Sequence, residues 1–318
     1  MSWSLADVPE QSGRVAVVTG ANGGLGLATA LALAGQGAHV VMAARDAAKA
    51  ALARDRIRAE SPGASVEIVA LDLGSLASVE LAAGQILAAH PAIDLLITNA
   101  GVMAMPQGRT ADGFETQLGV NHLGHWALTS HLLPALVRTR DARVVTVTSG
   151  AQHTGRPLDP ADPFRLRDYD PWRAYADSKL ANRHFAQGLD RQFRAAGLSA
   201  RALTAHPGMT NSDLQATTVA AGGGGSAARF FLVATRRIGM DTERGALSQV
   251  RAATDPRAVG GTMYGPRWST VGAPVRRRLV RRGDDQAIRL LWQVSRQLTG
   301  LDVDVARTAA QTTWAPRP

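Results

Sequence analysis

The sequence predicts an α/β fold with a single doubly wound parallel sheet of about seven strands and helices on both faces. Strand and helix patterns alternate six times from residue 15 onward, without a change of composition between the rounds. Such alternation is typical of strand–helix–strand units whose strands run parallel. Each strand pattern is also an almost unbroken apolar run, as expected where helices cover both faces of a sheet.

The individual elements follow from the hydrophobic pattern. Short β-branched runs predict strands over 15–19, 39–43, 66–70, 93–98, 143–148, 200–206 and 262–264. Segments with helical spacing predict helices over 24–36, 47–60, 76–90, 113–139, 227–238, 242–253 and 286–298, besides one that carries Tyr175 and Lys179. We expect residues 1–318 to form a single domain, with an extension over about 266–318 that frays after Thr312.

The pattern loosens after the strand over 200–206. Four consecutive glycines, Gly222 to Gly225, indicate that 215–226 is too flexible for a core element, and an apolar helical pattern resumes at residue 227. A mobile loop followed by such a helix predicts a lid over about 212–240.

Bulk composition excludes several classes of protein. The 318 residues are 45% hydrophobic and 5% aromatic, a globular composition. No apolar run reaches the roughly 18 residues of a membrane span, and the first residues lack a basic segment before an apolar core. We therefore expect a cytoplasmic protein. The absence of cysteine excludes disulfides, thiolate metal ligands and cysteine nucleophiles.

The net charge of +9 raises the possibility of a nucleic-acid partner, but the arginines are mostly dispersed. The one dense cluster, Arg276 to Arg282, is followed by two aspartates and contains no aromatic residue that could stack on bases. It indicates a solvated face or a contact between subunits, and we expect no nucleic-acid partner. Contact with an anionic membrane surface stays open, because 230–233 and Trp292 could add apolar area.

A glycine-rich turn follows the first predicted strand and opens the first predicted helix, as a dinucleotide-binding fingerprint requires. It reads Thr19-Gly-Ala-Asn-Gly-Gly-Leu-Gly26. Glycine lets the backbone approach a pyrophosphate closely, and the helix N-terminus offers unpaired N–H groups. A plain tight turn is the alternative interpretation. The candidate cofactor-binding residues here are Gly20, Asn22, Gly23, Gly24, Leu25 and Gly26.

The residue after the second strand bears on the choice of cofactor. An acidic side chain there binds the ribose 2′-hydroxyl of NAD, whereas an arginine accommodates the 2′-phosphate of NADP. Arg45 stands at that place, which favours NADP(H), although Asp46 follows and Arg45 could merely be solvated. Asp72, after the third strand, could accept a hydrogen bond from the adenine amine or could cap a helix.

Tyr175 and Lys179 lie four residues apart, in a chain with three tyrosines and with only two lysines against 33 arginines. Residues at this spacing share one face of a helix. An ammonium beside a phenol favours the phenolate, so we expect Lys179 to lower the pKa of Tyr175 toward neutrality. A solvent-facing pair is the alternative. His122, His125 and His131 have no carboxylate or thiolate to complete a ligand set, and we expect no metal site.

Taken together, these motifs resemble the short-chain dehydrogenase/reductase family over about 13–265, a family with a Rossmann-type sheet. The resemblance rests on the glycine turn, Asn99-Ala-Gly101, Asn121, Ser149, Tyr175-x-x-x-Lys179 and His206-Pro-Gly208. Asn121 to Trp126, the 26-residue separation of Ser149 from Tyr175, and Lys179 to Asn182 are similar to the retinol-dehydrogenase-like branch.

The resemblance implies an enzyme that transfers hydride between a nicotinamide and a carbonyl or alcohol. It implies that Ser149 polarises the substrate oxygen, Tyr175 exchanges the proton, Lys179 also holds the nicotinamide ribose, and Asn121 anchors a water relay. Ser149 is preferred to Thr148, which we place at the end of the strand. Further cofactor contacts are implied at Asp72, Leu73, Asn99, Ala100, Gly101, Pro207, Gly208 and Ser212. Family members commonly form dimers or tetramers, so we expect a homo-oligomer.

The sequence leaves the substrate open. Val102 to Pro106 is predominantly apolar, which together with the lid favours a lipophilic aldehyde, ketone or alcohol, although an apolar lid also simply packs on the sheet. A dinucleotide-binding sensor without turnover is the alternative function. A nucleotide-sugar epimerase conflicts with the glycine spacing and with the lack of a large C-terminal substrate domain.

Overall fold

The computed structural model describes residues 2–165, 167–277 and 283–312. Apolar strand patterns form one eight-stranded sheet, in the order β3-β2-β1-β4-β5-β6-β7-β8. Its strands are β1 (Val15–Thr19), β2 (His39–Ala44), β3 (Val66–Ala70), β4 (Leu95–Thr98), β5 (Arg143–Val147), β6 (Arg201–Ala205), β7 (Met263–Pro266) and β8 (Pro274–Arg277). The first seven are parallel, and β8 pairs antiparallel with β7.

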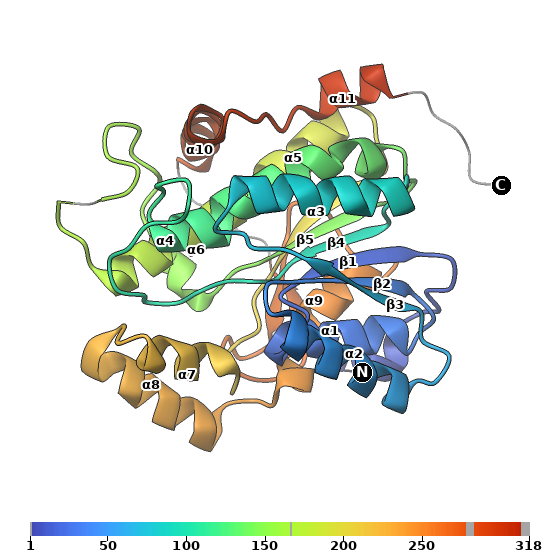
Figure 1. Ribbon diagram of the computed structural model, residues 1–318, viewed down its shortest axis with the longest axis horizontal. Helices are drawn as coiled ribbons and strands as arrows, with labels where there is room; N and C mark the ends of the chain where they lie inside the picture. Colours follow the sequence, from blue (N-terminus) through green and yellow to red (C-terminus); the bar gives the residue numbers. More distant parts are fainter. Residues whose placement is uncertain (1, 166, 278–282, 313–318) are drawn as a thin grey trace.

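Helices cover both faces of the sheet (Figure 1). One face carries α3 (Leu76–Ala89), α5 (Gly124–Val137) and α6 (Pro171–Ala195), with α10 (Asp284–Thr299) and α11 (Val305–Gln311) outside them. The other face carries α1 (Gly24–Ala34), α2 (Ala47–Glu60) and α9 (Thr242–Thr254). Two apolar cores lie between these layers and the sheet, so the predicted doubly wound α/β architecture is confirmed.

The strand order indicates at which edge of the sheet a ligand would bind. The chain turns outward in one direction from β1 to β3 and in the other from β4 onward, so the switch point lies between β1 and β4. In open parallel sheets, ligands bind beyond the carboxyl ends of the strands at such a point. The segments that follow β1, β4 and β5 therefore meet at one edge of the sheet.

Two predicted elements differ from the structure. The helix predicted over 113–139 begins only at α4 (Thr116–Leu118) and contains a π-helical turn over Gly119–Leu123 before α5. The segment 215–226 is not a flexible loop, because α7 (Asp213–Ala220) occupies its first half and α8 (Gly225–Ile238) begins at its end. Helix α7 has no Gly in its interior, and the glycines instead form the sharp connection to α8.

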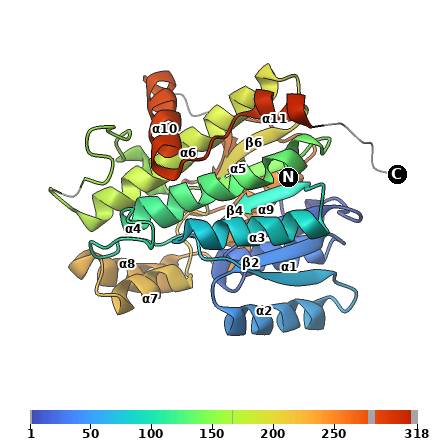
Figure 2. The same ribbon diagram turned by 45° about the horizontal axis from the view of Figure 1, so that its top comes forward.

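Figure 2 shows α7 and α8 side by side, apart from the layers that cover the two faces of the sheet. Helix α8 exposes Phe230, Val233 and Ile238. Trp292 does not share that surface, since it stacks on Phe185 and its indole N–H donates to the Val303 carbonyl. No helix in the described ranges is long and apolar enough to cross a membrane. Arg276 and Arg277 belong to β8, while Arg278 to Arg282 and the tail after Thr312 lie outside the described residues.

Candidate active site

The turn between β1 and α1 forms a cradle at the carboxyl edge of the sheet. Gly20 and Gly24 have φ angles of +67° and +49°, which residues other than glycine rarely adopt. A Cβ at Gly26 would collide with the Gly20 carbonyl and with the Asn99 side-chain amide. Asn22, Gly23 and Leu25 lie in the same turn. Backbone packed this closely at a helix N-terminus fits a bound pyrophosphate.

A buried hydrogen-bond network fixes this cradle to the end of β4. The Thr19 hydroxyl accepts from the backbone N–H of Asn99 (2.9 Å) and of Ala100 (3.0 Å). His125 Nδ1 lies 3.1 Å from the Asn121 carbonyl, which only accepts, so Nδ1 carries the proton and Nε2 accepts from Thr19 at 2.9 Å. Burial lowers the pKa of His125 to about 4, which keeps the ring neutral.

Sequence reasoning missed Thr19, His125 and Gln249 as parts of this network. The side-chain amide of Asn99 donates to the Thr19 carbonyl at 2.9 Å, and its oxygen accepts from Gln249 on α9 at 3.1 Å. Only the position of Thr19, at the last residue of a strand before the glycine turn, was a signal in the sequence. His122 is likewise engaged in packing, against Phe185 and Trp126, with a hydrogen bond to Ser295.

The residues beyond β2 and β3 flank the cradle. Arg45 follows β2 and is exposed, whereas the Asp46 carboxylate caps α2 by accepting from the Lys49 N–H at 3.0 Å. Asp72 is not a helix cap, because Ser75 caps α3. Its Oδ1 accepts instead from the Gly74 N–H at 2.9 Å, and Leu73 beside it packs into the core.

Helix α6 brings Tyr175 and Lys179 to the same edge. Asp170 accepts from the Arg173 N–H at 2.8 Å and Pro171 is the first helical residue, so the N-terminus is firmly set. Tyr175 and Lys179 are 5% and 4% exposed, so the two side chains do not face solvent. The Lys179 Nζ lies 5.7 Å from the centre of the Tyr175 ring.

The pKa of Tyr175 is raised to about 12, contrary to the lowering that we expected. Burial is the main cause, because it disfavours the phenolate, and a hydrogen bond from Ser149 only partly offsets it. Burial also lowers the pKa of Lys179 to about 8. The spacing of four residues predicted the neighbourhood correctly, but burial sets the direction of both pKa shifts.

Asn121 and Lys179 lie together against Gly101. A Cβ at Gly101 would stand 2.9 Å from Asn121 Oδ1 and 3.2 Å from Lys179 Nζ. The Asn121 amide accepts from the Val102 N–H at 2.8 Å and donates to the Val102 carbonyl at 2.9 Å. Asn121 lies in the π-helical turn, a feature frequent at functional sites.

Ser149 and Thr148 follow β5 and have separate tasks. The Thr148 hydroxyl is buried and donates to the Lys179 carbonyl at 2.7 Å, which anchors α6. Ser149 faces Tyr175 and hydrogen-bonds to its hydroxyl. The Val147 carbonyl accepts from Asn182 at 3.1 Å and from Lys179 at 3.4 Å, so this strand end positions the ammonium as well.

Helices α7 and α8, the segment that the sequence predicted as a lid, lie against the cluster that contains Tyr175. The Tyr175 ring packs with Met103 and Ala104. Leu214 of α7 and Trp172 lie against this cluster. The Thr218 hydroxyl donates to the Met103 carbonyl at 2.7 Å, and the Trp172 indole donates to the Gly224 carbonyl at 3.1 Å. The described site is therefore closed over its catalytic candidates.

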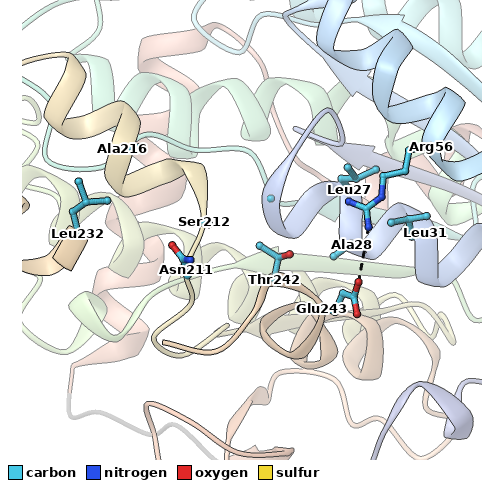
Figure 3. Close-up of a pocket in the computed structure, with 11 residues that line it drawn as sticks. Leu27, Ala28, Leu31, Arg56, Asn211, Ser212, Ala216, Leu232, Thr242 and Glu243 are labelled. Atoms are coloured by element: carbon cyan, nitrogen blue, oxygen red, sulfur yellow. Dashed lines mark ion pairs between the residues drawn. The ribbon is translucent and has the colours of Figure 1, made fainter. Parts of the chain in front are cut away.

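A cavity of ≈ 290 Å³ lies between α1, α7 and α8 (Figure 3). Leu27, Ala28 and Leu31 of α1 line one wall, and Asn211, Ser212 and Thr242 line the other. Arg56 and Glu243 form a 3.9 Å ion pair at its rim. Ser212 lies across from Gly24, whereas Pro207 and Gly208 form the turn after β6, where Gly208 has a φ of +78°.

These features are those of a dinucleotide-dependent oxidoreductase of the Rossmann type, and comparison with known proteins agrees. The family model for short chain dehydrogenase matches residues 14–222. The chain belongs to the short-chain dehydrogenase family, and the enzyme class expected from its sequence is confirmed.

The relatives found include human proteins of the predicted branch. Human dehydrogenase/reductase SDR family member 13 is 46% identical over 294 residues, which cover 91% of this chain and 74% of that protein. Human retinol dehydrogenase 11 is 41% identical over 292 residues, covering 92% and 87%. Human retinol dehydrogenase 12 is 43% identical over 202 residues, and the match spans 63% of its length and 64% of this chain.

Solved structures share the fold. A protein from Mycobacterium Paratuberculosis has a TM-score of 0.75 and 39% sequence identity, with 95% of this chain and 99% of that one covered. A dehydrogenase from Beutenbergia cavernae, solved with bound NADP, has a TM-score of 0.62 and 26% identity, with 80% and 96% covered.

Proposed function

We propose that this protein is an NADP(H)-dependent oxidoreductase that interconverts a lipophilic aldehyde or ketone and its alcohol. The observation that carries the proposal is the hydrogen bond between Ser149 and Tyr175, one helical turn from the buried Lys179. Two hydroxyl groups and an ammonium converge there, beside the glycine cradle of a dinucleotide.

The catalytic groups have different roles in the transfer of the proton. When bound, the dihydronicotinamide supplies the hydride that reduces the carbonyl carbon. Ser149 donates a hydrogen bond to the carbonyl oxygen, and Tyr175 donates the proton that this oxygen takes up. A pKa of about 12 keeps the phenol protonated at neutral pH, so that its proton is present when the carbonyl is reduced. Lys179, whose pKa of about 8 leaves it charged at neutral pH, stabilises the phenolate left behind.

Arg45 supports the preference for NADP(H). Its side chain is exposed beyond β2, where a 2′-phosphate is recognised in this type of fold, while Asp46 is engaged in capping α2. The Beutenbergia cavernae structure, which contains NADP, is a relative in fold.

The lining of the closed site supports a lipophilic substrate. Met103, Ala104, Trp172 and Leu214 surround Tyr175, and they offer mainly apolar contact. Retinol and polyprenol, which appear in the names of relatives, are lipophilic alcohols.

A substrate panel tests the proposal. Purified protein is supplied with NADPH or NADH and with aldehydes and ketones of increasing chain length. We expect NADPH to be preferred and rates to rise with apolar length. Tyr175→Phe should lose about 1000-fold in kcat while its affinity for NADPH is kept. Tyr264→Phe, on β7, is the matched control and should keep its rate. NADPH binding without turnover of any substrate would favour the sensor instead.

The cofactor preference has its own test. Arg45→Ala should weaken NADPH binding about tenfold and leave NADH binding unchanged, since only NADPH carries the 2′-phosphate. Arg54→Ala, on the surface of α2, is the control. Equal weakening of both cofactors would remove Arg45 from the recognition of the phosphate.

A further inference from the structure

A cluster of possible metal ligands lies at the opposite end of the sheet from Tyr175. In the described ranges, His39, Glu67 and His90 are the one group of three or more such side chains whose donor atoms all lie within 4.8 Å of one another. His39 is the first residue of β2, Glu67 the second of β3, and His90 the residue after α3. Since the strands are parallel, this is the amino edge of the sheet, away from the cradle.

The distances are close to those of a bound metal. His90 Nε2 lies 2.7 Å from Glu67 Oε1, and His39 Nε2 lies 3.6 Å from the same oxygen. The two imidazole rings are 4.7 Å apart between centres. Donor atoms around tetrahedral Zn²⁺ stand about 3.3 Å apart, because Zn–N and Zn–O bonds are about 2.0 Å long. The His90–Glu67 separation is shorter than this distance, and the His39–Glu67 separation is longer.

One ring nitrogen in the cluster points to a cation. His39 Nε2 is buried and makes no hydrogen bond to any described group, although a carboxylate oxygen lies near it. His39 Nδ1 is 2.7 Å from the Ser65 hydroxyl. If Nδ1–H donates to Ser65, the Nε2 lone pair faces the carboxylate, and two acceptors oppose each other. A divalent ion bound by both atoms satisfies them, and Ser65 then orients the ligating ring.

We propose that His39 Nε2, His90 Nε2 and the Glu67 carboxylate bind a Zn²⁺ ion, with water as the fourth ligand. Imidazole and carboxylate are ligands that Zn²⁺ accepts in tetrahedral sites. The side chains of His39, Glu67 and His90 are 26%, 37% and 16% exposed, so the cluster lies near the surface of the protein. The ion joins the edge strand β3 to β2 and to the end of α3. It therefore stabilises the edge of the sheet and takes no part in hydride transfer.

The sequence did not reveal this site because its ligands are 28 and 23 residues apart, on two strands and beyond a helix. The histidines considered from the sequence were close together on one helix. Parallel pairing brings His39 and Glu67 to one face of the sheet, since Val40 pairs with Val66 and Val41 with Glu67.

The test uses the full chain without a polyhistidine tag, stripped with a chelator and dialysed. Calorimetric titration with Zn²⁺ at pH 7.5 should show one site per chain, and the melting temperature should rise by about 4 °C at saturating Zn²⁺. Bound Co²⁺ should give the visible absorption of tetrahedral coordination. Glu67→Gln and His90→Gln should each lose at least tenfold in affinity and lose most of the shift. His131→Gln, on α5, is the control and should bind as the wild type does.

Two results would overturn the proposal. One is the absence of Zn²⁺ binding by the wild type, which would leave a hydrogen-bonded cluster of structural value only. The other is equal binding by the wild type and Glu67→Gln, which would place the ion elsewhere. Melting temperatures measured with chelator present show whether each variant is folded before Zn²⁺ is added. NADPH turnover, measured with and without Zn²⁺, should not change.

Discussion

The cofactor cradle and the lid that faces it are held in place by different means. The cradle is joined to the core by Thr19, Asn99 and His125, whose polar atoms are paired in a buried network. The described contacts that join the lid to the rest of the fold include hydrogen bonds of Thr218 and of Trp172 and the small apolar cluster around Tyr175. Helix α8 leaves Phe230 70% exposed.

The difference indicates which region moves. A segment with few buried contacts opens at a lower free-energy cost than a segment embedded in the core. Since Tyr175 is covered by Met103 and by Leu214 of α7, we expect α7 to move away from Met103 when a substrate enters, and we expect the cradle to keep its shape. We expect binding of cofactor and of substrate to respond to different mutations.

The largest effect is expected at Lys179, whose ammonium lies beside Gly101 and the Tyr175 ring. Lys179→Arg places a longer, planar cation where the ammonium is 4% exposed and close to Gly101. Turnover should fall about 1000-fold, measured as kcat with NADPH and a saturating aldehyde. The other lysine of the chain, Lys49, is exposed on α2, so Lys49→Arg is a matched control with unchanged kcat. An active Lys179→Arg enzyme would mean that any cation suffices there.

The second largest effect is expected in the cradle, from the substitution Gly26→Ala. The added methyl group meets the Gly20 carbonyl and Asn99, so the turn must shift. We expect NADPH affinity, measured by fluorescence titration, to fall about 100-fold. Gly84→Ala adds the same methyl group to α3, where no heavy atom lies within 4 Å, and should bind NADPH normally. Unchanged NADPH affinity in Gly26→Ala would show that the cradle can deform, contrary to the rigidity expected from its buried hydrogen-bond network.

The network of the cradle should make the fold sensitive to acid. His125 has a folded-state pKa of about 4, against an ordinary value of 6.5 for histidine. Above pH 6.5 the ring is neutral in both states and its contribution is fully present. As the pH falls toward 4, the unfolded chain binds a proton that folded His125 does not, so stability is lost, by about 2 kcal/mol at pH 5.

Urea unfolding at pH 7.5 and pH 5 measures this loss. His125→Gln should lose about 2 kcal/mol less on acidification than the wild type. His131→Gln should lose as much as the wild type. His122, with a pKa of about 3, acts in the same direction in every variant, so only the differences between variants are informative. An equal loss in His125→Gln would contradict the assignment of a neutral His125.

The smallest effect is expected at the lid. Thr218→Val removes the hydrogen bond to the Met103 carbonyl, which is worth about 1 kcal/mol, and destabilises the closed position. KM for the carbonyl substrate should rise about fivefold, while the Kd of NADPH stays the same. Thr217→Val, at the exposed neighbouring position, is the control. A change in NADPH binding alone would mean that the lid belongs to the cofactor region.

Much of the fold could be predicted because each strand and helix has its own pattern. The apolar runs predicted the first six strands to within two residues at each end. Strand β8 was missed, since Pro274 to Arg277 has no apolar alternation and forms a strand only by pairing with β7. Helix α7 was missed because the four glycines beside it suggested a flexible loop, whereas Leu214 and Thr218 hold it against the core.

The sequence by itself determined the order of the elements, the glycine turn and the pairing of Tyr175 with Lys179, because these depend on residues close together in the chain. Only the tertiary structure decided the charge states of the buried groups and the contacts between residues far apart in the chain. The pKa of Tyr175 rises because the lid and the loop after β4 exclude water from it. His39 and Glu67 come together because β2 pairs with β3, and His90 joins them from the end of α3. The spacing of residues along the chain contains no information about burial or about contacts between distant segments.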